Sequence, residues 1–374
     1  MKKMIVLLTI CSLLLTACGG KAPAGTAQNG STADIGTTTQ TTAAETQTGS
    51  TTAAAAQEKV SDYFPFAGDV HMTYSGTGNE YAAYETFVDY IKDNKMQLRK
   101  NNGGTEAVTV YTVKDGALVS TYARGGVEYK FDYTSIPAKE DILLKEPLEA
   151  GTSWTSADGA TRSITAVGKQ IATPAGTFDS IEVTTKGENF SIKDYYAKGI
   201  GLIKTEYNSS DGTMTVVSEL EKVEKDVPFK RVVRFYYPQF DKDRIVYVER
   251  EVEIRTNEDI RNIFRNELKT VPESNGLSKT LTENTEILGI LLDDEKDTVT
   301  VDLSSDFVKE MNAGVAFEGM LLDSVVNTFG NYYMKSKVII TIDGKPYESG
   351  HVLMKPGEAF DVKTDGVQPA EPAK

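Results

Sequence analysis

The sequence has few of the residues on which small exported domains and many enzymes depend. Its 374 residues include two cysteines, Cys11 and Cys18, and both lie near the N-terminus. The rest of the chain therefore has no thiol for a disulfide, a cysteine-ligated metal or a cysteine nucleophile. Its stability must come from buried apolar surface, which a hydrophobic content of 40% allows.

Catalytic motifs are also scarce. The sequence has two histidines, His71 and His351, and they belong to no His-x-x-x-His pair. It contains no Gly-x-Ser-x-Gly elbow and no Asp-x-Asp-x-Asp-Gly loop. We therefore expect no catalytic residue, no metal site and no cofactor, and we interpret both histidines as surface or strand residues.

A cluster of basic residues is missing as well. The formal net charge is −14, and lysines and arginines form no block or stripe. This argues against nucleic-acid binding and against adhesion of the protein surface to anionic headgroups. We expect the acidity to keep the protein soluble.

The N-terminus has the pattern of a secretory signal. Two lysines precede an apolar run at 4–15, which is too short to span a bilayer. The tetrapeptide Leu15-Thr16-Ala17-Cys18 resembles the bacterial lipobox. The resemblance implies that a signal peptide, 1–17, is removed and that fatty acid such as palmitate is attached to Cys18. We expect a lipid-anchored protein on the extracytoplasmic face of the bacterial membrane. The alternative is an ordinary signal peptide that happens to end in cysteine.

The next segment, 18–57, is rich in Ala, Thr, Gly and Ser, with Ile35 as its one large aliphatic residue after Cys18. Such a composition buries too little surface to offset the entropy of ordering, so the segment is interpreted as a disordered linker.

Residues 58–226 read as a β-rich domain of short strands separated by turns. The stretch 108–113 is rich in β-branched residues, and Lys114-Asp115-Gly116 turns it into a second strand. The segment 81–91 fits either a helical face or a strand, and its β-branched and aromatic content favours a strand. These patterns predict a strongly curved, half-barrel-like antiparallel sheet.

Residues 229–361 have the pattern of strands mixed with helices, and 362–374 are interpreted as a flexible tail. Strands are expected at 231–237, 244–254, 286–292, 298–303 and 338–342. Helices are expected from an N-cap at Thr256 and around 317–329. The order β-β-α-β-β-α-β predicts a two-layer α/β sandwich with helices on one sheet face. The whole chain is therefore assigned to the α+β class.

The C-terminal part resembles the GerM domain of sporulation and germination lipoproteins. The matching pieces are Phe235-Tyr236-Tyr237-Pro238, Gly276-Leu277-Ser278, Thr285-Glu286-Ile287-Leu288-Gly289 and above all Val299-Thr300-Val301-Asp302-Leu303-Ser304. The resemblance implies a non-enzymatic α/β unit similar to ring-building domains of the sporulation channel. The region around Trp154 is similar to a curved-sheet domain found in bacterial lipoproteins.

Aromatic residues of the β-rich domain provide one candidate site. Tyr74, Tyr81, Tyr84 and Trp154 could form a groove for an acyl chain or a glycan, although core packing explains them more simply. The acidic turn 293–297 could bind a cation weakly, but it also suits the solvated tip of a hairpin. Asp302 is expected to hydrogen-bond a turn.

The sequence thus favours a non-enzymatic envelope scaffold. The expected partners are the membrane, through Cys18, and envelope proteins or further copies of the chain, through the GerM-like domain. The alternative is a module that binds lipid or peptidoglycan glycan through the β-rich domain. A hydrolase with a carboxylate pair is a third, weaker hypothesis.

Overall fold

The computed structural model describes residues 58–271 and 276–371. The expected signal peptide, Cys18 and the linker lie outside the described residues. Lys59–Lys374 forms one compact unit. Within the described part of the chain, no helix combines the length and the apolar character needed to cross a bilayer.

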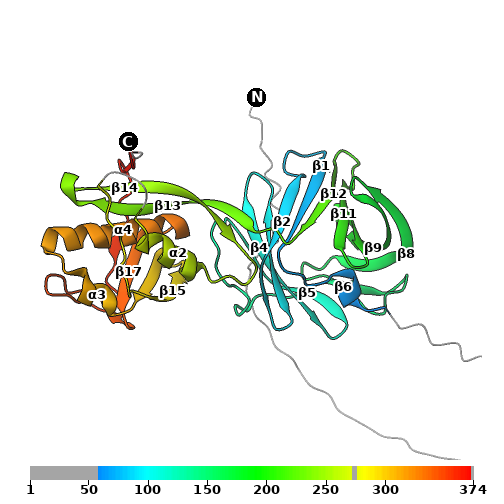
Figure 1. The fold of residues 1–374 in the computed structure, drawn as a ribbon. Helices are drawn as coiled ribbons and strands as arrows, with labels where there is room; N and C mark the ends of the chain where they lie inside the picture. Colours follow the sequence, from blue (N-terminus) through cyan, green and yellow to red (C-terminus); the bar gives the residue numbers. More distant parts are fainter. Residues whose placement is uncertain (1–57, 272–275, 372–374) are drawn as a thin grey trace, which may run out of the picture. The chain divides into compact units, whose positions relative to one another are not determined.

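The first part of this unit is a short helix and a twelve-stranded antiparallel sheet, which confirms the expected large antiparallel sheet (Figure 1). The sheet order is β6-β5-β4-β3-β2-β1-β12-β11-β10-β9-β8-β7. The elements are α1 (Val60–Tyr63), β1 (Val70–Thr77), β2 (Tyr84–Lys92), β3 (Lys95–Asn101), β4 (Glu106–Lys114), β5 (Ala117–Gly125), β6 (Asp141–Lys145), β7 (Ser153–Thr155), β8 (Thr161–Thr173), β9 (Gly176–Lys186), β10 (Phe190–Ala197), β11 (Gly201–Ser209) and β12 (Thr215–Lys225).

Local sequence explains the hairpins of this sheet. Asp115 and Gly116 have φ values of 51° and 67°, so the expected Asp-Gly turn joins β4 to β5. The ambiguous segment 81–91 contains β2, as its β-branched and aromatic content predicted. In this sheet each pair of neighbouring strands is consecutive in sequence, apart from the pair β1 and β12.

The two outer strands of the sheet meet each other. Trp154 on β7 donates from Nε1 to the carbonyl of Ile142 on β6 over 2.8 Å. Val60 and Tyr63 of α1 pack into the core cluster that contains Leu118 and Ile181 from opposite halves of the sheet. The sheet is therefore bent into a partly closed form, which Figure 1 shows.

The second part is mixed α and β. Its elements are β13 (Phe229–Gln239), η1 (Phe240–Lys242), β14 (Arg244–Ile254), α2 (Ile260–Lys269), β15 (Ile287–Asp293), β16 (Thr298–Leu303), α3 (Asp306–Met311), α4 (Val315–Tyr333), β17 (Lys337–Ile342), β18 (Lys345–Pro346), β19 (Phe360–Asp361) and β20 (Gln368–Pro369). The N-cap of α2 is Asp259, whose side chain accepts from the amide of Arg261. Thr256, the expected cap, instead accepts from the amide of Asp69.

The strands of the second part form two sheets, whereas the sequence predicted one. One sheet is β13-β14-β20, and the other is β15-β16-β17-β18 with β19 beside β17. Helix α4 contacts strands of both sheets and is buried around most of its circumference. A helix that is buried on most sides packs on more than one face, and here each face meets a different sheet.

The structure corrects the predicted flexible tail in its described part, 362–371. Residues 362–371 are fixed by hydrogen bonds, because Asn327 accepts from the amide of Lys363 at 2.8 Å and Tyr247 accepts from the amide of Ala370 at 2.8 Å. The strand β20 pairs in parallel with β14. Backbone pairing thus orders a segment whose proline and glycine content indicated a loop.

Candidate functional site

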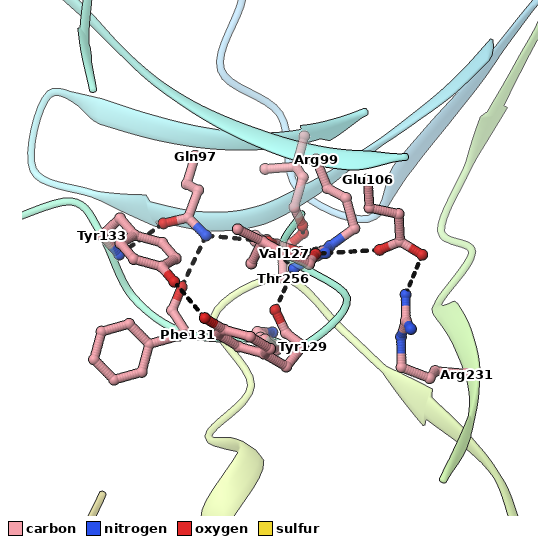
Figure 2. Close-up of polar contacts among 12 residues, drawn as sticks. Gln97, Arg99, Glu106, Val127, Tyr129, Phe131, Tyr133, Arg231 and Thr256 are labelled. Carbon is pink, nitrogen blue, oxygen red and sulfur yellow. Dashed lines mark hydrogen bonds and ion pairs between the residues drawn. The ribbon is translucent and has the colours of Figure 1, made fainter. Parts of the chain in front are cut away.

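A buried arginine joins the curved sheet to the second part of the unit (Figure 2). Arg99 on β3 is 1% exposed. Its guanidinium pairs with Asp89 at 2.9 Å and with Glu106 at 2.8 Å, and it donates to the carbonyls of Val127 and Tyr129. Every charge in this cluster is thus matched, as burial requires.

The same cluster reaches β13. Glu106 also pairs with Arg231, so one carboxylate joins β4 to β13. Gln97 donates to Asp89 at 3.0 Å and accepts from the amide of Tyr133 at 2.8 Å. The network therefore fixes the segment 127–133 and the start of β13, and it serves positioning rather than binding.

A second junction lies at Asp69. Its amide donates to Thr256 Oγ1 at 2.7 Å, and its carboxylate accepts from the amide of Thr256 at 2.8 Å and pairs with Arg255 at 2.9 Å. Burial alone raises the pKa of Asp69, but the bonds from Thr256 and Arg255 outweigh it, so the net pKa is lowered.

A groove of about 400 Å³, lined by both polar and apolar side chains, opens beside the first turn of α4. Phe317 is 45% exposed, and its ring stacks on Phe240 at 4.5 Å between centroids. The groove is also lined by Met311, Ala313, Leu321 and Lys279. An exposed aromatic ring in a concave surface is typical of a contact site for another molecule.

The family comparison decides what this part is. Residues 234–348 match the family model Germane, which is described as "Sporulation and spore germination". These residues are similar to that family, and 234–348 is called the Germane domain below after the model that it matches. The match confirms the GerM-type resemblance derived from the sequence. All lining residues of the groove, from Phe240 to Leu321, lie within the Germane domain.

Solved structures show weaker likeness. A protein of Bacteroides fragilis, described as exported and with a YmcC-like fold, is 14% identical over 43% of this chain and 98% of its own, with a TM-score of 0.28. The tandem GerMN domains of the sporulation protein GerM from Bacillus subtilis are 18% identical over 38% of this chain and 48% of their own, with a TM-score of 0.27. The comparison with curated proteins gave no match. Because these TM-scores are low, the identification depends on the family model alone.

Asp302 of the Germane domain hydrogen-bonds a turn, as the sequence predicted. Its carboxylate accepts from Thr341 Oγ1 at 2.6 Å and from the amide of Gly344 at 2.8 Å. The bond to Gly344 holds the turn after β17. Asp302 is thus part of the scaffold of the strongest family motif.

The acidic turn 293–297 is paired with cations of the chain. Asp294 contacts Arg124 of β5 and lies 2.5 Å from Lys335 Nζ. The pair with Arg124 is the main reason that the pKa of Asp294 is lowered. The expected solvated tip therefore also makes a contact to the curved sheet.

The two histidines both face carboxylates. His351 Nδ1 lies 2.7 Å from Glu318, which is 2% exposed and also accepts from Tyr347 at 2.8 Å. His71 lies between Glu85 and Glu224 and stacks on Phe87. Among the residues that the structure describes, no group of three or more His, Cys, Asp and Glu side chains has the arrangement of a metal site.

The four aromatic residues singled out in the sequence do not share one groove. Tyr74 and Tyr84 stack at 4.3 Å between centroids in one core cluster. Trp154 is buried in a different cluster, and Tyr81 is 47% exposed just before β2. Core packing accounts for three of the four.

Sequence reasoning missed a lysine beside this aromatic pair. Lys100 Nζ lies 3.6 Å from the centroid of the Tyr84 ring. Desolvation by the surrounding protein lowers the pKa of Lys100 to about 8, although its side chain still reaches water. The register that pairs Lys100 with Thr86 places it on the face of Tyr84, and this register is not readable from the sequence.

Proposed function

We propose that this protein is a non-enzymatic scaffold of the bacterial cell envelope, acting in sporulation or spore germination and anchored through lipid on Cys18. The Germane match at 234–348 carries the proposal. The groove beside Phe317 supports it, because it offers a contact surface within that domain. The matched charges at Arg99 support a scaffold whose parts are held together by buried ion pairs.

A deletion strain tests the biological role. Spore yield, spore germination and vegetative wall integrity are measured in the deletion strain and after complementation with the wild-type gene. We expect a defect in sporulation or germination that complementation restores. Normal sporulation and germination in the deletion strain would contradict the proposal.

The anchor is tested separately. Cell fractionation and mass spectrometry of the mature N-terminus should place the wild-type protein in the membrane with acyl chains on its first residue. The substitution Cys18→Ala should release it from the membrane fraction. Native protein in the culture medium, without fatty modification, would refute the anchored form of the proposal.

Self-association is measured by light scattering on residues 59–374, which form the compact unit. Concentration-dependent assembly supports a scaffold built from copies of the chain, because heterologous contacts between identical units can close into rings. A strict monomer restricts the proposal to partners of another kind.

A second candidate function is ligand binding by the curved sheet. The exposed side chain of Lys100, whose ammonium group lies over the buried ring of Tyr84, is the contact point that this function would use. Native mass spectrometry of residues 59–374 with lipid extracts, and sedimentation with purified peptidoglycan, test it. The substitution Lys100→Met should reduce any binding, and the absence of retained mass and of sedimentation would reject this function.

A further inference from the structure

One edge strand of the Germane domain has no charged residue along most of its length. β15 is the outer strand of the sheet β15-β16-β17-β18. Its residues 287–292 are aliphatic or glycine, and its first charged residue is Asp293. Edge strands are ordinarily protected from other strands by charged side chains. β13, the outer strand of the other sheet, carries Lys230 and Arg234, whereas β15 lacks this protection.

The hydrogen bonds beside β16 show which backbone groups of β15 are already used. The amide of Ser304, just after β16, donates to the carbonyl of Glu286, just before β15. Because backbone direction alternates along a strand, every second residue before Ser304, including Thr300, also directs its groups toward β15. The partner of Thr300 in the register is Leu291. Leu291 therefore directs its amide and carbonyl into the sheet, toward β16.

The residues on either side of Leu291 direct their backbone groups away from the sheet. Ile290 and Leu292 thus present their amides and carbonyls at the free edge of β15. Among the residues that the structure describes, none hydrogen-bonds to these groups. The open part of the edge is therefore the stretch centred on Leu291.

Other parts of the chain reach β15 only before and after this stretch. Helix α2 contacts its start, where Arg261 donates to the carbonyl of Leu288. The curved sheet makes its contact beyond the end of the strand, where Arg124 pairs with Asp294. Neither contact involves the outward-directed groups.

The side chain at the centre of the open stretch is apolar and exposed. Leu291 is 68% exposed. Its neighbours Ile290 and Leu292 pack against the hydrophobic core, so Leu291 lies on the opposite face of the sheet. An exposed aliphatic side chain beside unpaired backbone groups is the pattern of an edge that accepts another strand.

A second copy of β15 fits this edge. With a two-fold axis at Leu291, antiparallel pairing places Ile290 of each copy opposite Leu292 of the other. Each of these pairs exchanges two hydrogen bonds, which uses every open amide and carbonyl of both copies. The two Leu291 residues then form a non-hydrogen-bonded pair, in which side chains approach most closely, with Cα atoms about 4.5 Å apart.

The charges also favour a second copy at β15. In this register Asp293 lies opposite Gly289 of the other copy, so no two charged residues of the strands face each other. β13 behaves differently. Antiparallel pairing of two copies of β13 about Val232 would place Lys230 opposite Arg234, and like charges in opposite positions are destabilising.

We propose that two copies of this protein associate through the edges of β15, by antiparallel strand pairing about Leu291. This inference rests on the scaffold role proposed above and names one contact through which copies of the chain assemble. The contact is isologous, so it closes at a dimer. It is also small, and we therefore expect a weak dimer with a Kd of about 1 mM or somewhat tighter.

Disulfide trapping tests the register. Residues 59–374 contain no cysteine, so Leu291→Cys introduces a single thiol. A cysteine pair at the axis, with Cα atoms about 4.5 Å apart, is within the range of a disulfide. The matched control is Leu353→Cys, at a position that is 74% exposed and lies outside β15. We expect L291C to form linked dimers under mild oxidation about tenfold faster than L353C, because the contact raises the effective concentration of the thiols. Equal rates would overturn the inference.

A charge at the axis tests the contact itself, by sedimentation equilibrium of residues 59–374. Leu291→Lys places two like charges opposite each other, so we expect it to weaken association about tenfold or more. The control Val232→Lys, at a position of β13 that is 60% exposed, should associate as the wild type does. Circular dichroism confirms that both variants fold.

Two results of this experiment would overturn the inference. One is a wild type that stays monomeric at about 1 mM, and the other is a folded L291K that associates as strongly as the wild type. A sporulation defect in the deletion strain would in either case still support the scaffold, because that measurement does not depend on contacts between copies.

Discussion

The buried Arg99 cluster makes a quantitative prediction. Replacing Arg99 by Met removes the ion pairs with Asp89 and Glu106 and leaves the carbonyls of Val127 and Tyr129 without their donor. Asp89 then stays buried as an uncompensated carboxylate. Breaking a buried pair from one side in this way costs about 3–5 kcal/mol. We therefore expect R99M to lower the free energy of unfolding of residues 59–374 by about that amount.

Urea denaturation measures this loss. The single tryptophan, Trp154, is buried in the curved sheet and reports on that part, while near-ultraviolet circular dichroism reports on the aromatic cores of both parts. The matched control is Arg234→Met. Arg234 pairs with Glu249 on the surface, where such pairs contribute about 1 kcal/mol or less.

A double variant separates charge from packing. Asp89→Leu combined with R99M removes the orphaned carboxylate, so it should recover part of the stability that R99M loses. The reasoning about buried charge is refuted if R99M lowers the free energy of unfolding no more than R234M does. It is also refuted if adding Asp89→Leu to R99M lowers the free energy of unfolding further, by as much as an independent core substitution would.

Three further predictions concern single sites. Gly330→Ala places a Cβ 2.2 Å from Val362 Cγ2, so it should lower the free energy of unfolding by about 1–3 kcal/mol, and Val362→Ala should restore part of that loss. The control is Gly319→Ala in the same helix, whose Cβ meets no atom within 4 Å and which should be neutral or stabilising. Thermal denaturation of the wild type and these three variants measures the differences. Burial lowers the pKa of Lys130 to about 8, while an unfolded lysine stays protonated to about pH 10. The wild type should therefore gain stability relative to Lys130→Met between those pH values, and a difference that stays constant in urea titrations at pH 7 and pH 10 would contradict this. Asp302→Ala should cost about 1–2 kcal/mol through the lost bonds to Thr341 and Gly344, and Asp302→Asn, which keeps an acceptor, should cost less in the same titration.

Much of the fold was accessible from local pattern. The turn at Asp115 and Gly116 and the β-branched runs beside it predicted a hairpin, because both depend on residues that are close in sequence. The number of sheets in the second part was not accessible in this way. The stretch 320–333 is buried on nearly all sides, but its polar residues, such as Asp323 and Asn327, led to the prediction of one amphipathic face.

The candidate sites were harder to predict than the strands. Arg99, Glu106 and Arg231 come from three strands, and their meeting depends on registers that no single segment encodes. Charged residues that alternate along a strand are ordinarily interpreted as facing solvent. Tyr81 and Trp154 do not lie beside Tyr84, although the sequence suggested one groove for all three. Residue type alone does not determine which face of the sheet a side chain occupies.

The junction at Asp69 has a mechanical consequence. β1 begins at Val70 and β12 ends opposite it at Lys225, so the chain enters and leaves the curved sheet at one point. Asp69 is bonded there directly to Thr256 of the Germane domain. The junction therefore holds the entry to β1 and the exit from β12 together against Thr256, while α1 and the Arg99 cluster anchor the curved sheet at two further points.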